Sequence, residues 1–357
     1  MSDDYFKKIL KHELSWCKFM GYFNPYVDPF QDFLSKKIPD FDGQAYNRYP
    51  KHRFVYDKLW IMKSQGLMCG EVKNLTKNDA IDLPIFIKPR WGHKTASSKN
   101  CYKIKTWESL EKYRNIPDLM WSEFIDDNEC MTDYILLNGT IVYQITYKYS
   151  QEQTGYIEKW KYISSDNKPL PNVTEWVKMH LNGFTGAVNV QYRGDKIIEV
   201  GLRLARGGAY ILSTKNKYLI QNINNVVEKN HWDYGIEDKL IFTPFYSFKC
   251  YSTAPLFYVY PQKTIDYIMK SYDCMPFYEY YFEPSGNDGN VFMQFMHKDF
   301  DIGMKCKEHL ENSITYAQYL FIILFFVSLL LINLNKYIGI FLLIFVGLLF
   351  NSRFLNP

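Results

Sequence analysis

A long run of uncharged, mostly apolar residues near the C-terminus is the feature that most limits the fold of this chain. It extends from Ile314 to Leu334 and reads ITYAQYLFIILFFVSLLLINL. At about 1.5 Å per residue, a helix of this length spans the roughly 30 Å of a bilayer core. The run therefore predicts a transmembrane helix.

A second apolar run, from Tyr337 to Phe350, is shorter and is marginal for spanning a bilayer. We expect it to form the second arm of a transmembrane helical hairpin after a polar turn at 333–336. An interfacial or re-entrant segment is the alternative. The N-terminal sequence has no apolar signal-peptide core, and Lys305 and Lys307 precede the first span, so we expect the rest of the chain in the cytosol.

Charge and cysteine usage argue against two classes of function. The 42 basic and 38 acidic residues give a net charge of +4, which is too balanced to indicate a nucleic-acid-binding protein. The seven cysteines are dispersed without a CxxC pair, which fits neither a disulfide framework nor a zinc site. They indicate a reducing compartment and buried thiols.

The order of the expected elements indicates an α+β fold, because antiparallel hairpins alternate with helices. One hairpin turns at Asn138-Gly139 and a second turns at 193–195. We expect helices at 57–66, 106–113 and 173–181, strands at 83–89, 119–125, 186–192 and 196–200, and the first hairpin over 134–147.

The segment from Ile197 to Gly208 carries the strongest chemical pattern. An apolar strand contains one carboxylate, Glu199, and is followed by Arg203, Arg206 and a glycine pair. Successive side chains of a strand alternate between its faces, so Glu199 and Arg203 project together. A carboxylate can bind a divalent ion while a guanidinium meets phosphoryl oxygens. A surface salt bridge at the strand end is the alternative.

Two lysines are candidates for binding phosphate. Lys88 ends an apolar strand, before a loop that contains Gly92, Ser97 and Ser98. A lysine at a strand end beside small hydroxyl residues can hold a polyphosphate, assisted by backbone N–H groups. A solvated lysine is the alternative for Lys88, and a surface helix lysine is the alternative for Lys58.

Further polar residues follow at strand ends. The segment 121–129 leads from a strand into an acidic turn, which could offer backbone groups to a base and Glu129 to ribose hydroxyls. A solvated acidic loop explains that segment equally well. Gln191 and Glu199 lie on adjoining strands and supply oxygen ligands of the kind that Mg²⁺ requires.

Taken together, these residues resemble the ATP-grasp superfamily. The resemblance covers roughly residues 55–215, and its specificity comes from the order of five motifs, because none of them is specific alone. The chain is also similar to viral and phage proteins of this type. The matching positions are Asp57-Lys58, PIFIKP at 84–89, EFIDDNE at 123–129, Gln191 and EVGLRLAR at 199–206.

The resemblance implies a two-lobed nucleotide-binding domain at 56–230, after a short irregular lead-in at 1–55 and before an aromatic-rich α+β extension at 231–312. ATP and Mg²⁺ are the implied cofactors. The implied nucleotide contacts are Lys58 and Lys88 to the α- and β-phosphates, the backbone from Glu123 to Ile125 to adenine, and Glu129 to ribose.

The same resemblance implies that Gln191 and Glu199 ligate Mg²⁺, while Arg203 and Arg206 stabilise the transferring phosphoryl group. Enzymes of this superfamily typically phosphorylate a carboxylate with ATP and let an amine attack the acyl phosphate. A membrane-anchored ATP-dependent carboxylate–amine ligase is therefore the first hypothesis. Its partners would be the bilayer of a cellular, host or virion membrane, ATP and an unidentified carboxylate and amine.

Three positions depart from the family pattern. Gly201 stands where an asparagine ligand is usual, Ser122 stands where an acidic residue commonly contacts adenine, and the loop after Lys88 has few glycines. A catalytically degenerate nucleotide-binding or structural membrane protein is therefore the second hypothesis.

Overall fold

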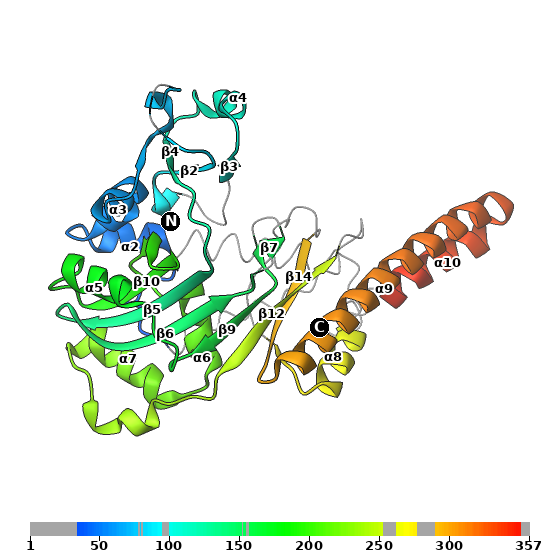
Figure 1. The fold of residues 1–357 in the computed structure, drawn as a ribbon. Coiled ribbons are helices and arrows are strands. Elements are labelled where there is room, and N and C mark those ends of the chain that lie inside the picture. The colour runs from blue at the N-terminus through cyan, green and yellow to red at the C-terminus, as the bar shows by residue number, and fades with distance from the viewer. Residues whose placement is uncertain are drawn as a thin grey trace. The chain divides into compact units, whose positions relative to one another are not determined.

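The computed structural model describes residues 34–77, 79, 81–94, 100–151, 153–154, 157–252, 262–276 and 290–350 (Figure 1). The chain divides into two compact units. The large unit comprises residues 29–151 and 162–244, and the C-terminal unit comprises 1–28, 152–161 and 245–357. Ser97 and Ser98 lie outside the described residues.

A small antiparallel sheet in the large unit carries Lys88. Its strands lie in the order β1-β4-β2-β3 and bury an apolar cluster that includes Ile85, Ile87 and Trp121. The predicted capping residue Thr106 accepts a hydrogen bond from Ser109 N at 3.3 Å at the start of α4. The elements are β1 (Cys69–Glu71), β2 (Ile85–Pro89), β3 (Tyr102–Ile104), α4 (Trp107–Leu110), η4 (Glu111–Tyr113) and β4 (Leu119–Glu123).

A larger sheet carries Gln191 and Glu199. Within the large unit its strand order is β11-β10-β5-β6-β9. The two predicted hairpins are confirmed: β5 and β6 join at Asn138-Gly139, and β10 and β11 join around Gly194. Gly139 has φ +83°, which glycine adopts without strain. The strands are β5 (Glu129–Leu137), β6 (Thr140–Tyr149), β9 (Trp160–Ser164), β10 (Gly186–Arg193) and β11 (Lys196–Gly201).

One face of this sheet is apolar and packs against helix α5 (Pro171–His180). Tyr134, Val188 and Val190 from the strands pack with Val173 and Val177 from the helix. Because side chains alternate along each strand, the residues between them project from the opposite face. The antiparallel pairing of β2 with β4, and of β5 with β6 and β10, agrees with the predicted α+β class.

The expected lead-in at 1–55 is not irregular where the structure describes it, because it contains the helix α2 (Asp42–Arg48) and the 3-10 turn η1 (Arg53–Tyr56). Ala45 of α2 and Val55 of η1 are fully buried in the same core as the apolar face of the larger sheet. Apolar side chains separated by irregular spacing gave no helical period in the sequence, but tertiary packing orders them.

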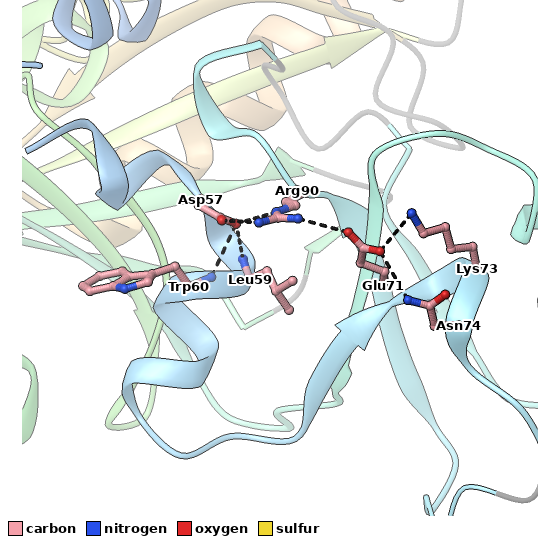
Figure 2. Close-up of polar contacts among 7 residues, drawn as sticks. All are labelled: Asp57, Leu59, Trp60, Glu71, Lys73, Asn74 and Arg90. Atoms are coloured by element: carbon pink, nitrogen blue, oxygen red, sulfur yellow. Dashed lines mark hydrogen bonds and ion pairs between the residues drawn. The ribbon is translucent and has the colours of Figure 1, made fainter.

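Asp57 fixes the start of α3 (Lys58–Ser64) beside the end of β2. Its Oδ1 accepts hydrogen bonds from Leu59 N and Trp60 N, and its carboxylate pairs with Arg90 at 2.6 Å (Figure 2). Arg90 reaches Glu71 of β1 at 3.1 Å, and Glu71 also pairs with Lys73 (Figure 2). Lys58 N donates to Arg90 O at 2.9 Å. Lys58 therefore lies close to the strand that ends in Lys88 and Pro89.

The large unit is completed after β11 by helices and turns. The 3-10 turn η5 (Ala205–Gly208) leads into α6 (Ala209–Ser213), and α7 (Lys217–Lys229) ends at Asn230 in the left-handed conformation. The turn η6 (Tyr234–Lys239) follows.

The C-terminal unit has its own core. Phe248, Phe295 and Ile268 pack there against Cys306 and Leu310 of helix α9. Its elements are β7 (Gln153–Thr154), β8 (Ile157–Glu158), β12 (Phe245–Ser252), α8 (Gln262–Ser271), β13 (Met275–Pro276), β14 (Asn290–His297), α9 (Phe300–Leu334) and α10 (Lys336–Phe350).

Helix α9 leaves this core and continues without a break into the apolar run (Figure 1). Among the described helices it is the one long and apolar enough to cross a membrane. After Asn335 the shorter helix α10 packs against α9, with Val346 in contact with Ala317 and Phe321. Many large apolar side chains of α9 and α10 are exposed, among them Ile323, Leu330 and Phe341.

Candidate functional site

The second face of the larger sheet gathers polar residues from three strands. Gln191 lies opposite Glu199, and Asn189 lies opposite Gly201 on one side and Asp133 on the other. Opposed residues of an antiparallel pair share a face of the sheet. The face opposite α5 therefore carries a row of oxygen-bearing side chains.

Lys58 and Lys88 converge on this row at Glu199. Lys58 Nζ lies 2.9 Å from Glu199 Oε2, and Lys88 Nζ donates to the backbone oxygen of Ile198 at 2.9 Å. The two lysines are 5% and 6% exposed, so neither is the solvated surface lysine considered as an alternative. Lys58 thus contacts the metal-ligand candidate directly, and Lys88 contacts the residue before it.

The pKa values of Lys88 and Glu199 are both lowered, for different reasons. Burial and the nearby charge of Lys58 together lower the pKa of Lys88 to about 7, although Glu199 opposes both. Burial alone would raise the pKa of Glu199, but the charge and hydrogen bond of Lys58 outweigh it and lower that pKa. Two amines facing one carboxylate favour the entry of another anion.

Glu129 and Gln191 contact each other at the edge of the same row. Gln191 Nε2 donates to Glu129 Oε1, and Arg193 Nη2 donates to Glu129 Oε2 at 2.8 Å. Because its nitrogen points to Glu129, the amide oxygen of Gln191 points elsewhere and can ligate an ion. The predicted ribose and metal residues are thus neighbours.

Arg203 and Arg206 both follow β11, but their contacts and backbone conformations differ. Arg203 Nη2 pairs with Asp42 Oδ2 at 2.6 Å, and Nη1 donates to Leu204 O at 3.0 Å. Arg206 is half-buried and has φ +49°, in the left-handed region. The surface salt bridge considered for this segment is not formed between Glu199 and Arg203, because each has a different partner.

Glu123 lies away from Lys88 along the small sheet, and Ile125 follows two residues after the end of β4. Lys88 pairs with Met120 in the β2–β4 register, whereas Glu123 pairs with Ile85 three residues along. Glu123 N donates to Met68 O at 3.0 Å, and its Oε1 accepts from Met68 N at 2.9 Å. The structure therefore places this segment at the other end of β4.

Asp133 is a buried carboxylate that the sequence did not single out. It accepts hydrogen bonds from Asn189 Nδ2 at 2.8 Å, from Tyr147 Oη at 2.6 Å and from Ala205 N at 2.9 Å. Burial raises its pKa to about 6, although these hydrogen bonds oppose the rise. By holding Ala205 N, Asp133 fixes the start of the turn that carries Arg206. An aspartate within an apolar strand is the signal that could have identified it.

Asp42 is a second residue that the sequence did not single out. It belongs to α2, yet its carboxylate reaches β11: a Cβ atom at Gly201 would lie 2.6 Å from Asp42 Oδ1. The donor set of Glu199, Gln191 and Asp42 consists of oxygens, which fits a hard divalent ion such as Mg²⁺.

Comparison with known proteins assigns the fold. No family model and no curated protein sequence matches the chain. The solved structure of carboxyaminoimidazole ribonucleotide synthase from Aspergillus clavatus, in complex with ATP, matches with a TM-score of 0.50 and 9% identity, over 74% of each chain. The chain has the ATP-grasp fold.

Two further solved structures are similar over comparable lengths. N5-carboxyaminoimidazole ribonucleotide synthetase from Thermus thermophilus is 11% identical, with a TM-score of 0.49, over 76% of this chain and 80% of that chain. L-amino acid ligase from Bacillus licheniformis is 13% identical, with a TM-score of 0.46, over 72% and 71%. The expected ATP-grasp fold is confirmed by the match to the Aspergillus clavatus synthase.

Proposed function

We propose that the chain is an ATP-dependent ligase that joins a carboxylate to an amine through an acyl phosphate. The observation that carries the proposal is that two buried amines lie beside Glu199: Lys58 pairs with its carboxylate, and Lys88 contacts the backbone oxygen of Ile198 and interacts with the Glu199 charge. Burying two amines beside one carboxylate is costly unless a further anion is bound there. A nucleotide polyphosphate supplies that charge, and the ATP-grasp fold is the scaffold on which the solved synthase binds ATP.

In this proposal each residue has a role set by its chemistry. Lys58 and Lys88 bind phosphate oxygens. Gln191 and Glu199 hold Mg²⁺. Arg203 and Arg206 contact the γ-phosphoryl group. Bound Mg²⁺ would neutralise phosphate charge and orient the nucleotide. When the nucleotide binds, the amine of Lys58 leaves the carboxylate of Glu199 and pairs with a phosphate oxygen.

The reaction then follows from positioning. A carboxylate oxygen of the substrate attacks the γ-phosphorus, the bond to the β–γ bridging oxygen breaks, and ADP leaves. The amine next attacks the acyl carbon, phosphate leaves and the amine loses a proton. The buried amines and guanidinium groups stabilise the charge that develops on phosphoryl oxygens, which is the main catalytic requirement of such transfers.

Binding of Mg-ATP to the full-length protein in detergent tests this proposal. We expect calorimetric binding that weakens when Mg²⁺ is omitted, and we expect the Glu199→Gln variant to lose this dependence on Mg²⁺ because its amide is a poorer ligand than a carboxylate. ADP release on addition of paired carboxylic acids and amines would then identify the substrate class. Absence of binding at millimolar nucleotide would contradict the proposal.

A nucleotide-binding protein without catalysis is the second candidate. Gly201 and the pairing of Glu199 with Lys58 favour it, because both reduce the oxygen ligands open to a metal. Binding of Mg-ATP without ADP release, across the same panel of acids and amines, would support this candidate over the ligase.

We further propose that α9 and α10 anchor the protein in a membrane, with the soluble part on the cytosolic side. Exposed apolar side chains of α9 include Leu320, Ile323 and Phe326, which are 49%, 58% and 59% exposed. A surface of this kind in water is unfavourable, whereas lipid covers it without cost. The apolar run of α10 is short for a bilayer span. The helix α10 is therefore either the second arm of a spanning hairpin or an interfacial helix.

Alkaline carbonate extraction checks the anchor. The full-length chain should stay with the membrane pellet, whereas a chain that ends at Tyr316 should move to the supernatant. This end point keeps Ile314, which is buried in the core of the C-terminal unit. Release of the full-length chain by carbonate would contradict the anchor, and tags at residues 1 and 357 on opposite sides would contradict the hairpin.

A further inference from the structure

Gly201 leaves a space on the polar face of the larger sheet, and Asp42 fills it. Gly201 follows Glu199 by two residues on β11, so a side chain at 201 would project from the same face as Glu199. A Cβ atom there would lie 2.6 Å from Asp42 Oδ1, closer than real Cβ atoms approach other atoms. A residue larger than glycine at 201 would therefore require the Asp42 side chain to move.

The two oxygens of Asp42 have different surroundings. Oδ2 accepts a hydrogen bond from Arg203 Nη2 at 2.6 Å. Oδ1 is buried and, within the part of the chain that the structure describes, has no hydrogen bond of normal geometry, although the Tyr56 hydroxyl interacts with the Asp42 carboxylate. A buried carboxylate oxygen without such a hydrogen bond is unfavourable and calls for a ligand. Arg203 thus orients a carboxylate whose second oxygen lies on the side of position 201.

The neighbours of Oδ1 support a cation there. Gln191 and Glu199 pair directly across β10 and β11, and Asp42 Oδ1 occupies the next position along the same face. The Tyr56 hydroxyl lies in this neighbourhood and accepts a hydrogen bond from Leu202 N at 2.9 Å. Carboxylate and amide groups from three elements thus lie along one face of the sheet, and hard divalent ions take oxygen ligands of this kind.

We infer that Asp42 supplies to the metal ion of this site the oxygen ligand that Gly201 cannot provide. The inference rests on the proposed Mg-ATP site and adds to it a residue from the N-terminal helix α2. The metal ligands are then Glu199, Gln191 and Asp42, and Arg203 positions the third of them.

Binding of Mn²⁺ to the full-length protein in detergent, followed by electron paramagnetic resonance in the presence of ATP, tests the inference. Mn²⁺ prefers the same oxygen ligands. We expect Asp42→Ala to weaken Mn²⁺ binding by about tenfold or more, a loss comparable to that seen on removing groups that support a metal site. We expect the double variant Asp42→Ala/Gly201→Asn to recover most of the affinity, because the asparagine oxygen enters the vacated space.

The outcomes separate this inference from the proposed function. If wild type binds Mn²⁺ and Glu199→Gln binds it weakly, but Asp42→Ala binds it as wild type does, the inference fails and the nucleotide site stands. If wild type binds no Mn²⁺ with ATP, both fail. If Asp42→Ala does not fold, Asp42→Asn replaces it, because the amide keeps the contact space and we expect a smaller loss.

The double variant also excludes a purely structural role for Asp42. Loss of affinity in Asp42→Ala could follow from release of Arg203 alone, and Gly201→Asn would then restore nothing. A folded double variant that stays as weak as Asp42→Ala would therefore overturn the inference. Gly201→Asn in the wild-type background should bind Mn²⁺ less tightly, because it collides with Asp42 Oδ1.

Discussion

Replacing Lys88 with methionine should weaken the binding of Mg-ATP about 100-fold and leave the protein folded. A hydrogen bond from a charged group to phosphate in a buried setting is worth up to about 3 kcal/mol, which corresponds to this factor. Stability should change little, because burial of the amine is itself unfavourable, as the lowered pKa of Lys88 indicates. Calorimetric titration with Mg-ATP and a thermal unfolding scan measure the two effects.

The pH dependence of binding identifies Lys88 as the responsible group. The pKa of Lys88 is about 7 in the ligand-free protein, so above that pH the lysine must take up a proton when phosphate binds. Affinity should therefore fall as pH rises from about 7 to 9, by up to tenfold per unit. Lys88→Arg stays charged throughout and should lack this slope. An unchanged slope in Lys88→Arg would contradict the assignment.

Replacing Asp133 with alanine should lower the free energy of unfolding of the large unit by about 3–5 kcal/mol. The change leaves three donors without their acceptor, namely Asn189 Nδ2, Tyr147 Oη and Ala205 N, and each buried unpaired donor costs about 1–3 kcal/mol. Urea unfolding followed by tryptophan fluorescence measures the loss. Activity should also fall, because Ala205 begins the turn that carries Arg206.

Two variants serve as controls for Asp133. Asp133→Asn keeps one oxygen for Ala205 N and Asn189, so its destabilisation should be about 1 kcal/mol. Asp238→Ala removes an exposed aspartate from η6 and should change stability by less than about 0.5 kcal/mol. If Asp133→Ala is no more destabilising than Asp238→Ala, the buried network contributes nothing to stability.

Local signals in the sequence were sufficient for most of the elements around the site. The turn at Asn138-Gly139, the glycine after the helix at 58–64 and the alternation in 186–200 each depend on neighbouring residues, and the structure contains each of these elements. The helix at 42–48 was missed because its apolar residues are few and its order comes from packing against distant strands.

The candidate site could be predicted only in part, because some of its contacts join residues that are distant in the sequence. Lys58, Lys88 and Glu199 could be named because the family pattern links them, and in the structure Lys58 pairs with Glu199 while Lys88 contacts the adjacent Ile198. The pairing of Asp42 with Arg203 joins residues 161 positions apart, and no sequence period reports such a contact. Asp133 was missed because one polar residue in an apolar strand does not reveal which donors surround it. A domain boundary at 56 would cut through the site, since Asp42 lies before it.

The position of Asp42 in the space where a side chain at 201 would lie has a consequence for evolution. The space beside Glu199 holds either the Asp42 carboxylate or a side chain at 201, but not both. The two positions should therefore change together among related chains: an asparagine at 201 should accompany a small residue at 42, and an aspartate at 42 should accompany glycine at 201. An evolutionary intermediate in which only one of the two positions has changed would have a weaker metal site.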